Sequence, residues 1–136
     1  MIASGNEIAP IHVLLVEDEW LISEWVAESL SDEGFAVHTV TNAADAMQYL
    51  KSTPVDVLFT DINLPGGTDG ATLARRAREL WPDLPVVYAS GRVNMLDSPM
   101  RVPDSMFVAK PYAPELVGRL LATAVKAHAG RERVPA

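Results

Sequence analysis

The chain contains no cysteine among its 136 residues, which excludes disulfide bonds and thiolate chemistry and gives no reason to expect an oxidising compartment. Long apolar runs are also missing, although a helix that crosses a bilayer needs about 20 apolar residues in succession. The N-terminal segment does not combine a basic stretch with an apolar one, as a secretory signal would. We therefore expect a cytoplasmic protein without a membrane partner.

Positive charge is scarce as well, because 11 lysine and arginine residues stand against 18 aspartate and glutamate residues. The formal net charge of −7 has the wrong sign for contact with nucleic-acid phosphates, so we do not expect nucleic acid as a partner. The 49% of apolar residues is enough for a packed core. The length suits one stand-alone domain, which we place at 11–128 between loose tails at 1–10 and 129–136, without room for an effector domain.

Five short apolar runs divide the chain, and each is nearly continuous rather than alternating. They cover residues 11–16, 35–40, 55–60, 85–89 and 106–109. Such runs are typical of strands that are buried on both faces of a parallel sheet. The sequence therefore predicts a sheet of five parallel strands.

The segments between these runs show helical periodicity. After the first run, Ile22, Val26 and Leu30 fall four residues apart and predict one inward-facing stripe. After the second run, Asn42 is suited to cap a helix over residues 43–52. We interpret Trp25 as a residue that packs against a neighbouring helix.

Two further helices are predicted in the second half of the chain. One covers about 70–81, where Trp81 is interpreted as a packing residue, and the last begins at Pro114, a residue that favours the first helical position. Their expected buried residues are Leu73, Ala77 and Leu80 in the former and Leu116, Leu120, Leu121, Ala124 and Val125 in the latter.

The segment between the fourth and fifth runs is the weakest helix candidate. Pro99 and Pro103 cannot lie inside a regular helix without the loss of hydrogen bonds, so we expect a short or irregular fourth helix there. Strands and helices otherwise alternate along the whole chain. Because right-handed crossovers connect parallel strands, this order predicts an α/β fold with a doubly wound parallel sheet.

Polar side chains follow four of the five predicted strands. Glu17 and Asp18 follow the first strand, Asp61 the third, Ser90 the fourth and Lys110 the fifth. In an open parallel sheet, sites form at the carboxyl ends of the strands, so these side chains are expected at one edge. Crowded carboxylates favour a counter-cation, and an all-oxygen set of ligands suits Mg²⁺ rather than zinc.

This set of groups is suited to phosphoryl transfer. A transferring phosphoryl group carries negative charge on three oxygens, and its transfer is catalysed mainly by positioning and countercharge. A magnesium ion, Lys110 and the hydroxyl of Ser90 could each meet one oxygen while the carboxylate of Asp61 attacks phosphorus. The sequence therefore predicts Asp61 as a nucleophile.

Together these residues resemble the response-regulator receiver family of two-component signalling. The resemblance rests on the acidic pair Glu17-Asp18, the stretch DINLPGGTDG from Asp61, the ASG around Ser90 and the FVAKPY that contains Lys110. It extends from about Ile11 to His128 and implies a flavodoxin-like (βα)5 fold with strand order 2-1-3-4-5. It also implies a regulatory phosphoacceptor domain and not a true enzyme.

The resemblance further implies the partners and ligands of the site. Asp61 would take its phosphoryl group from a histidine kinase or a histidine phosphotransfer protein, and a separate, unknown output protein would respond. Glu17, Asp18, Asp61 and the backbone carbonyl of Asn63 would hold Mg²⁺, with Mn²⁺ or Ca²⁺ as substitutes. The expected oligomeric state is a monomer or a weak homodimer.

Other roles follow from the resemblance alone. Ser90 and Phe107 would be the switch residues that move after phosphorylation, and Lys110-Pro111 is a candidate cis peptide bond. Asn63 and Arg92 would tune the lifetime of the phosphorylated state. Phe107 lacks the hydroxyl of the tyrosine that many relatives carry at this position, so packing alone would distinguish its two positions.

Two other functions remain open at this stage. An aspartyl-nucleophile phosphatase resembling the haloacid dehalogenase-like enzymes would also use Asp61, but those enzymes usually carry a second aspartate where this chain has Asn63. A degenerate receiver that acts only as a binding module is the other alternative, although such a domain is expected to have lost its acceptor or its lysine.

Trp20 lies two residues past Asp18 in the sequence. We therefore expect its side chain to lie over the metal site.

Overall fold

The computed structural model describes residues 9–91 and 101–132. Within these ranges the strands are β1 (His12–Val16), β2 (Ala36–Val40), β3 (Val57–Asp61), β4 (Val86–Ser90) and β5 (Met106–Ala109). The helices in the same ranges are α1 (Trp20–Asp32), α2 (Ala43–Ser52), α3 (Gly70–Leu80) and α4 (Pro114–Glu132).

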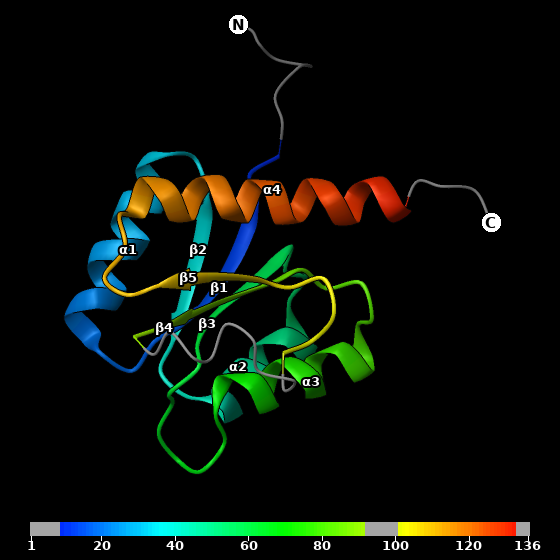
Figure 1. The fold of residues 1–136 in the computed structure, drawn as a ribbon, viewed down its shortest axis with the longest axis horizontal. Helices are drawn as coiled ribbons and strands as arrows, with labels where there is room; N and C mark the ends of the chain where they lie inside the picture. The colour runs from blue at the N-terminus through cyan, green and yellow to red at the C-terminus, as the bar shows by residue number, and fades with distance from the viewer. Residues whose placement is uncertain (1–8, 92–100, 133–136) are drawn as a thin grey trace, which may run out of the picture.

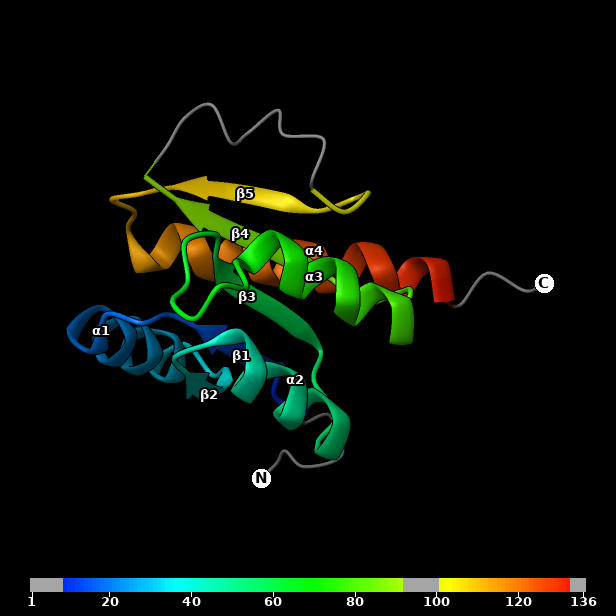
Figure 2. The same ribbon diagram turned by 90° about the horizontal axis from the view of Figure 1, so that it is seen from below.

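The strands form one parallel sheet with the order β2-β1-β3-β4-β5. Figure 2 shows β5 and β2 at opposite edges of this sheet, with β3 between them. The doubly wound fold and the strand order 2-1-3-4-5 are thereby confirmed.

The sheet separates two hydrophobic clusters. One cluster lies under α1 and α4 and includes Val26, Phe59 and Leu121, all of them buried. The other lies under α2 and α3 and includes Leu58 and Tyr88, which are also buried. Figure 1 shows this three-layer arrangement, with α4 on one side of the sheet and α2 and α3 on the other. Because both faces are covered at the centre of the sheet, β3 and β4 are buried at every position, whereas the edge strand β2 is partly exposed.

The helix starts predicted at Asn42 and Pro114 are confirmed, and the structure adds a third capped start. The side chain of Asn42 accepts a hydrogen bond from the backbone N–H of Asp45 at 2.8 Å, and α4 begins at Pro114. The side chain of Asp69 does the same for α3, because it accepts from the backbone N–H of Thr72 at 2.8 Å. Each cap satisfies a donor that the first turn of a helix would otherwise leave unpaired.

The prediction of burial is wrong for three residues. Leu80, Trp25 and Leu116 are 53%, 53% and 41% exposed, although periodicity or size favoured burial. Leu80 is the last residue of α3 and Leu116 lies in the first turn of α4. A stripe is buried only where another layer covers it, and the helix ends extend beyond that cover. In α1, the small polar Ser23 is buried beside Val26 instead of the bulky Trp25.

One boundary differs from the sequence-based prediction, and one predicted element falls mainly outside the described residues. The last helix continues to Glu132, four residues past the predicted domain end at 128, because no proline interrupts it before Pro135. The predicted fourth helix falls largely on 92–100, which lies outside the described residues. Residues 101–105, which follow, form turns and bends without helix. Within the described ranges, no helix combines the length and the apolar character needed to cross a membrane.

Candidate functional site

The polar residues predicted to converge come together at the carboxyl edge of the sheet. Asp61 and Ser90 are the last residues of β3 and β4, Glu17 follows β1 directly and Lys110 follows β5. The strand register places these positions at one level, since Asp61 pairs with Ala89 and the backbone N–H of Lys110 donates to the carbonyl of Ser90 at 2.9 Å. Glu17, Asp61 and Ser90 are 1%, 7% and 1% exposed.

Lys110 links the two buried carboxylates. Its Nζ donates to Oε1 of Glu17 and to Oδ2 of Asp61, each at 2.9 Å. The remaining carboxylate oxygens accept from the backbone, because Oε2 of Glu17 receives the N–H of Glu19 at 3.1 Å and Oδ1 of Asp61 receives that of Asn63 at 3.2 Å. Each buried charge therefore has a partner of opposite charge and a backbone donor.

Burial and pairing act in opposite directions on the ionisation of this cluster. Burial raises the pKa of Glu17 above its usual value, and the hydrogen bond from Lys110 opposes that shift. Burial alone would lower the pKa of Lys110, but its hydrogen bonds to Glu17 and Asp61 outweigh burial and hold its pKa above the usual value. Lys110 is therefore a cation at neutral pH, placed against two oxygen donors.

The acidic residues are arranged so that they could hold a divalent ion. One carboxylate oxygen from each of Glu17, Asp18 and Asp61 lies within 4.8 Å of the other two. Asp18 is exposed, whereas the other two are buried, so the cluster opens to solvent on one side. Oxygen ligands from several carboxylates, completed by water, suit Mg²⁺. These residues therefore fit the ion that the sequence predicts.

Comparison with known proteins identifies the family. A model of the response regulator receiver domain matches residues 13–121, which is most of the chain. The chain belongs to the response regulator receiver family.

Individual relatives agree with this assignment. The response regulator receiver protein CpdR of Brucella abortus is 33% identical over 105 residues, which cover 74% of this chain and 84% of CpdR. The transcriptional regulatory protein BaeR of Escherichia coli is 30% identical over 111 residues, 79% of this chain and 45% of BaeR. The chain thus spans about half the length of several curated relatives that it matches. A crystal structure of a receiver protein from Sinorhizobium medicae superposes with a TM-score of 0.82 at 32% identity, covering 90% of this chain and 99% of that one.

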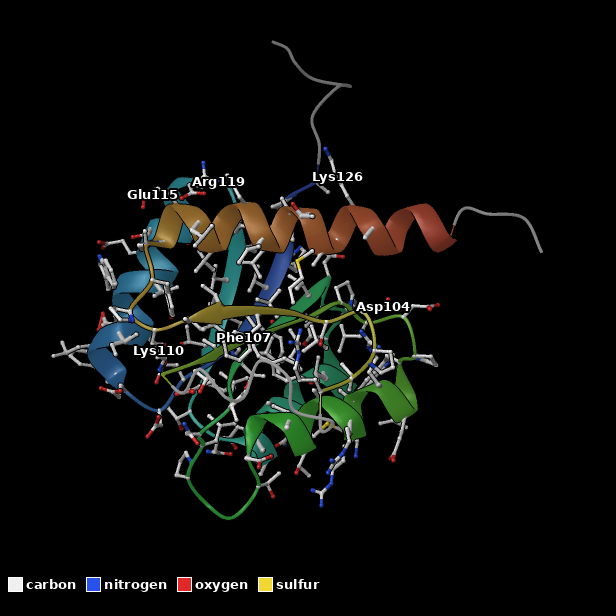
Figure 3. All side chains as sticks on the ribbon, in the orientation of Figure 1. Asp104, Phe107, Lys110, Glu115, Arg119 and Lys126 are labelled. Carbon is white, nitrogen blue, oxygen red and sulfur yellow. The ribbon has the colours of Figure 1, made fainter. Side chains whose placement is uncertain are left out.

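Of the two predicted switch residues, Ser90 ends β4 and Phe107 lies on β5, which the candidate cis peptide bond follows. Figure 3 shows Phe107 on β5, between Asp104 in the preceding turn and Lys110 at the carboxyl end of the strand. Phe107 is partly buried against the cluster under α2 and α3. The peptide bond between Lys110 and Pro111, the candidate named above, is cis.

Two predicted roles receive no support from the positions of the residues. Arg92 lies outside the described residues. Trp20 is 65% exposed, and no described contact joins it to the acidic cluster, so its position over the metal site stays a prediction. Asn63 is exposed and contacts Asp61 through its N–H, as described above.

Gly70 contributes to the site without having been singled out in the sequence. A Cβ atom at this position would overlap the backbone carbonyl oxygen of Asp61. Its own N–H donates to the carbonyl of Ile62 at 2.7 Å, which joins the start of α3 to the residue after Asp61. The available signal was a glycine directly after the capping residue Asp69, where a helix start normally accepts other residues.

Tyr112 was also missed. Tyr112 lies in the loop between β5 and α4, and its ring centroid is 5.9 Å from that of Phe59. Burial, with a smaller contribution from the charge of Glu17, raises the pKa of Tyr112 to about 12. The phenol therefore stays protonated near the acidic cluster, and its position two residues past Lys110 was the only signal in the sequence.

Proposed function

We propose that this receiver domain accepts a phosphoryl group on Asp61 from a histidine kinase or a histidine phosphotransfer protein, in a reaction that requires Mg²⁺. The observation that carries the proposal is the Asp61 carboxylate, which accepts from Lys110 at 2.9 Å and lies within 4.8 Å of the ligand oxygens of Glu17 and Asp18. A nucleophile, a cation and a set of metal ligands are thus adjacent at the carboxyl edge of the sheet.

In the proposed step, a carboxylate oxygen of Asp61 forms a bond to phosphorus while the phosphorus–nitrogen bond of the donor histidine breaks. The departing imidazole nitrogen keeps the bonding electron pair and takes up a proton from solvent. Lys110 already lies against Asp61, so its charge is in position to offset that of the incoming phosphoryl oxygens. The hydroxyl of Ser90, at the end of the neighbouring strand, would meet another of these oxygens.

Glu17, Asp18, Asp61 and the carbonyl of Asn63 would hold the magnesium ion. When bound, Mg²⁺ would supply positive charge between the carboxylates and the phosphoryl oxygens, which otherwise repel each other. Among the described residues, Lys110 is the cation that joins the two buried acids when Mg²⁺ is not bound. Phosphorylation should therefore depend on the divalent ion, with Mn²⁺ or Ca²⁺ as weaker substitutes.

The acyl phosphate would then change which protein the domain binds. We infer a two-state equilibrium in which Ser90 and Lys110 engage the phosphoryl group and Phe107 changes its position, with Asn63 and Arg92 setting the lifetime of the product. This signalling would take place in the cytoplasm. The output protein would be a protein that binds one of the two states more tightly than the other. None of the contacts described above identifies it.

Mass spectrometry of the intact protein after incubation with acetyl phosphate and Mg²⁺ tests this proposal. The wild-type chain should gain one phosphoryl group and Asp61→Asn should gain none. Asp83→Asn, which makes the same charge change at an exposed position at the opposite end of the sheet, should behave as the wild type does. Chelation of Mg²⁺ should prevent the gain.

Three results would contradict the proposal. The first is a phosphoryl gain that survives in Asp61→Asn. The second is a folded wild-type chain that gains nothing, which would favour a module that binds without phosphorylation. The third is continuous release of phosphate from small phosphate esters, which would favour the phosphatase alternative.

A further inference from the structure

Arg101 lies against two aromatic rings on neighbouring strands. Its guanidinium carbon is 6.0 Å from the ring centroid of Tyr88 on β4 and 5.7 Å from that of Phe107 on β5. Tyr88 and Phe107 are paired in the strand register, so their side chains share one face of the sheet. At these distances, the positive charge of the guanidinium is attracted to both π faces.

The guanidinium is held in place by the turn that precedes β5. Its Nη2 donates to the carbonyl of Ser105 at 2.9 Å, and its Nε donates to the hydroxyl of Ser105 at 3.4 Å. That hydroxyl donates in turn to the carbonyl of Val102 at 2.8 Å, while the N–H of Val102 donates to the phenolic oxygen of Tyr88 at 3.1 Å. Because Tyr88 is fully buried, the whole turn is fastened to the core of the domain.

Phe107 is the movable member of this group. It is partly buried and has no polar atom on its ring, so no hydrogen bond can fix its orientation. A change of its χ1 rotamer would carry the ring to a different position, while Arg101 would stay attached to Ser105. The contact between Arg101 and Phe107 therefore belongs to one rotamer of Phe107.

We propose that Arg101 is a positioning residue that stacks on Phe107 and holds it in the unphosphorylated conformation of the domain. This inference rests on the proposed function, because the position of Phe107 matters for signalling only if Asp61 is phosphorylated. A contact made in only one of two states shifts the equilibrium toward that state. By linkage, the same contact weakens the affinity of the domain for a phosphoryl group by the same factor.

Titration with beryllofluoride in the presence of Mg²⁺ tests the proposal, since this anion mimics a phosphoryl group on a carboxylate and binds at equilibrium. Arg101→Gln should bind beryllofluoride about threefold to tenfold more tightly than the wild type, which corresponds to the loss of one cation–π contact from the unliganded state. The matched control is Arg76→Gln, which removes the same charge from an exposed position on α3. A purely electrostatic effect would weaken the binding of an anion, so the two variants are expected to differ in sign.

A second pair of variants connects the effect to Phe107. Phe107→Leu keeps an apolar side chain but removes the π face, so Arg101→Gln should no longer change the affinity in that background. In the Arg101→Gln chain without ligand, the NMR signals of the Phe107 ring should also shift toward their positions in the beryllofluoride complex. A residue that only stabilises the turn would not produce this shift, and thermal unfolding of each variant checks that the fold is intact.

The possible outcomes separate the two proposals. If the wild type binds beryllofluoride but Arg101→Gln binds it no more tightly than Arg76→Gln does, the proposed role of Arg101 is overturned. The proposed function is then unaffected. A gain that persists in Phe107→Leu would overturn that role too, because the effect would not pass through the ring. A wild-type chain that binds no beryllofluoride would contradict the proposed function and, with it, this inference.

Discussion

The two ends of the sheet are built from different residues. At the carboxyl edge, the described structure gathers Glu17, Asp61 and Ser90 under nearly complete burial, with Lys110 between the two acids. At the amino edge, the connections 50–56 and 80–85 surround a hollow of about 710 Å³ whose lining includes three prolines and several apolar side chains. One end of the same sheet concentrates charge, and the other consists mainly of packing and turns.

This difference indicates how stability and chemistry are divided within the domain. Buried like charges cost folding free energy, and a structure retains them where they serve a site. The amino edge carries no comparable cluster among the described residues, so its side chains should matter for stability alone. Substitutions at the two ends are therefore expected to have separable effects, and the predictions below follow this separation.

The largest effect on stability is expected from Leu84→Ala at the amino edge. Leu84 is 7% exposed and belongs to the cluster under α2 and α3. Truncation should lower the free energy of unfolding by about 2–5 kcal/mol through lost burial and a new cavity. Denaturant unfolding measures this loss, while the phosphoryl gain of the folded fraction should be unchanged. A reduced phosphoryl gain in folded Leu84→Ala would show that the two ends are not separable.

A smaller loss of stability, together with a loss of chemistry, is expected for Gly70→Ala. The added methyl group would overlap the backbone carbonyl of Asp61, so the start of α3 or the strand end must shift, at a cost of about 1–3 kcal/mol. Phosphorylation should slow because the overlap falls on the backbone of Asp61, the proposed acceptor. Gly118→Ala is the control, since its methyl group would overlap only the end of the Glu33 side chain, which can turn aside, and would make an ordinary contact with the Phe35 ring. Equal effects of the two alanines on the rate of phosphorylation would contradict the explanation.

Local patterns predicted the parts of the structure that depend on neighbouring residues. The apolar runs located the strands, Asn42 marked a helix start, and the position of Lys110 after its strand predicted that it would reach the acidic edge. The exposed Leu80 and Leu116 could not be foreseen, because periodicity does not show where the covering layer ends. Contacts between distant segments were likewise absent from the sequence patterns.

The candidate site shows the same limit. Convergence of Glu17 and Asp61 followed from their strand positions, but the bridge from Lys110 to both acids depends on side-chain geometry. Gly70 and the stacking of Arg101 were missed for the same reason, since each depends on a close approach between separate elements. The sequence therefore predicted which residues meet and not how they contact one another.

The smallest effect should come from Asp18→Asn at the carboxyl edge, and its sign should depend on Mg²⁺. Asp18 is exposed and does not take part in the described Lys110 bridges, so its removal relieves repulsion from Glu17 and Asp61. Without divalent ions, the variant should be more stable than the wild type by roughly 0.5–1 kcal/mol. With Mg²⁺ at ten times its dissociation constant, the wild type should gain about 1.4 kcal/mol. The variant should lose most of this gain.

Thermal unfolding with and without Mg²⁺ measures both parts of this prediction. Asp83→Asn at the amino edge is the control, and it should leave the gain from Mg²⁺ intact. If Asp18→Asn responds to Mg²⁺ as strongly as the wild type does, the ion is held elsewhere and the contrast between the two ends loses its basis.

The most direct test of the central claim is the location of the phosphoryl group. After phosphorylation with acetyl phosphate and Mg²⁺, hydroxylamine should attack the acyl carbonyl, release phosphate and leave a hydroxamate on the acceptor. Tandem mass spectrometry of the digested protein should then find the hydroxamate at Asp61. A hydroxamate at Glu17, Asp18 or any other carboxylate, with Asp61 unmodified, would contradict the account.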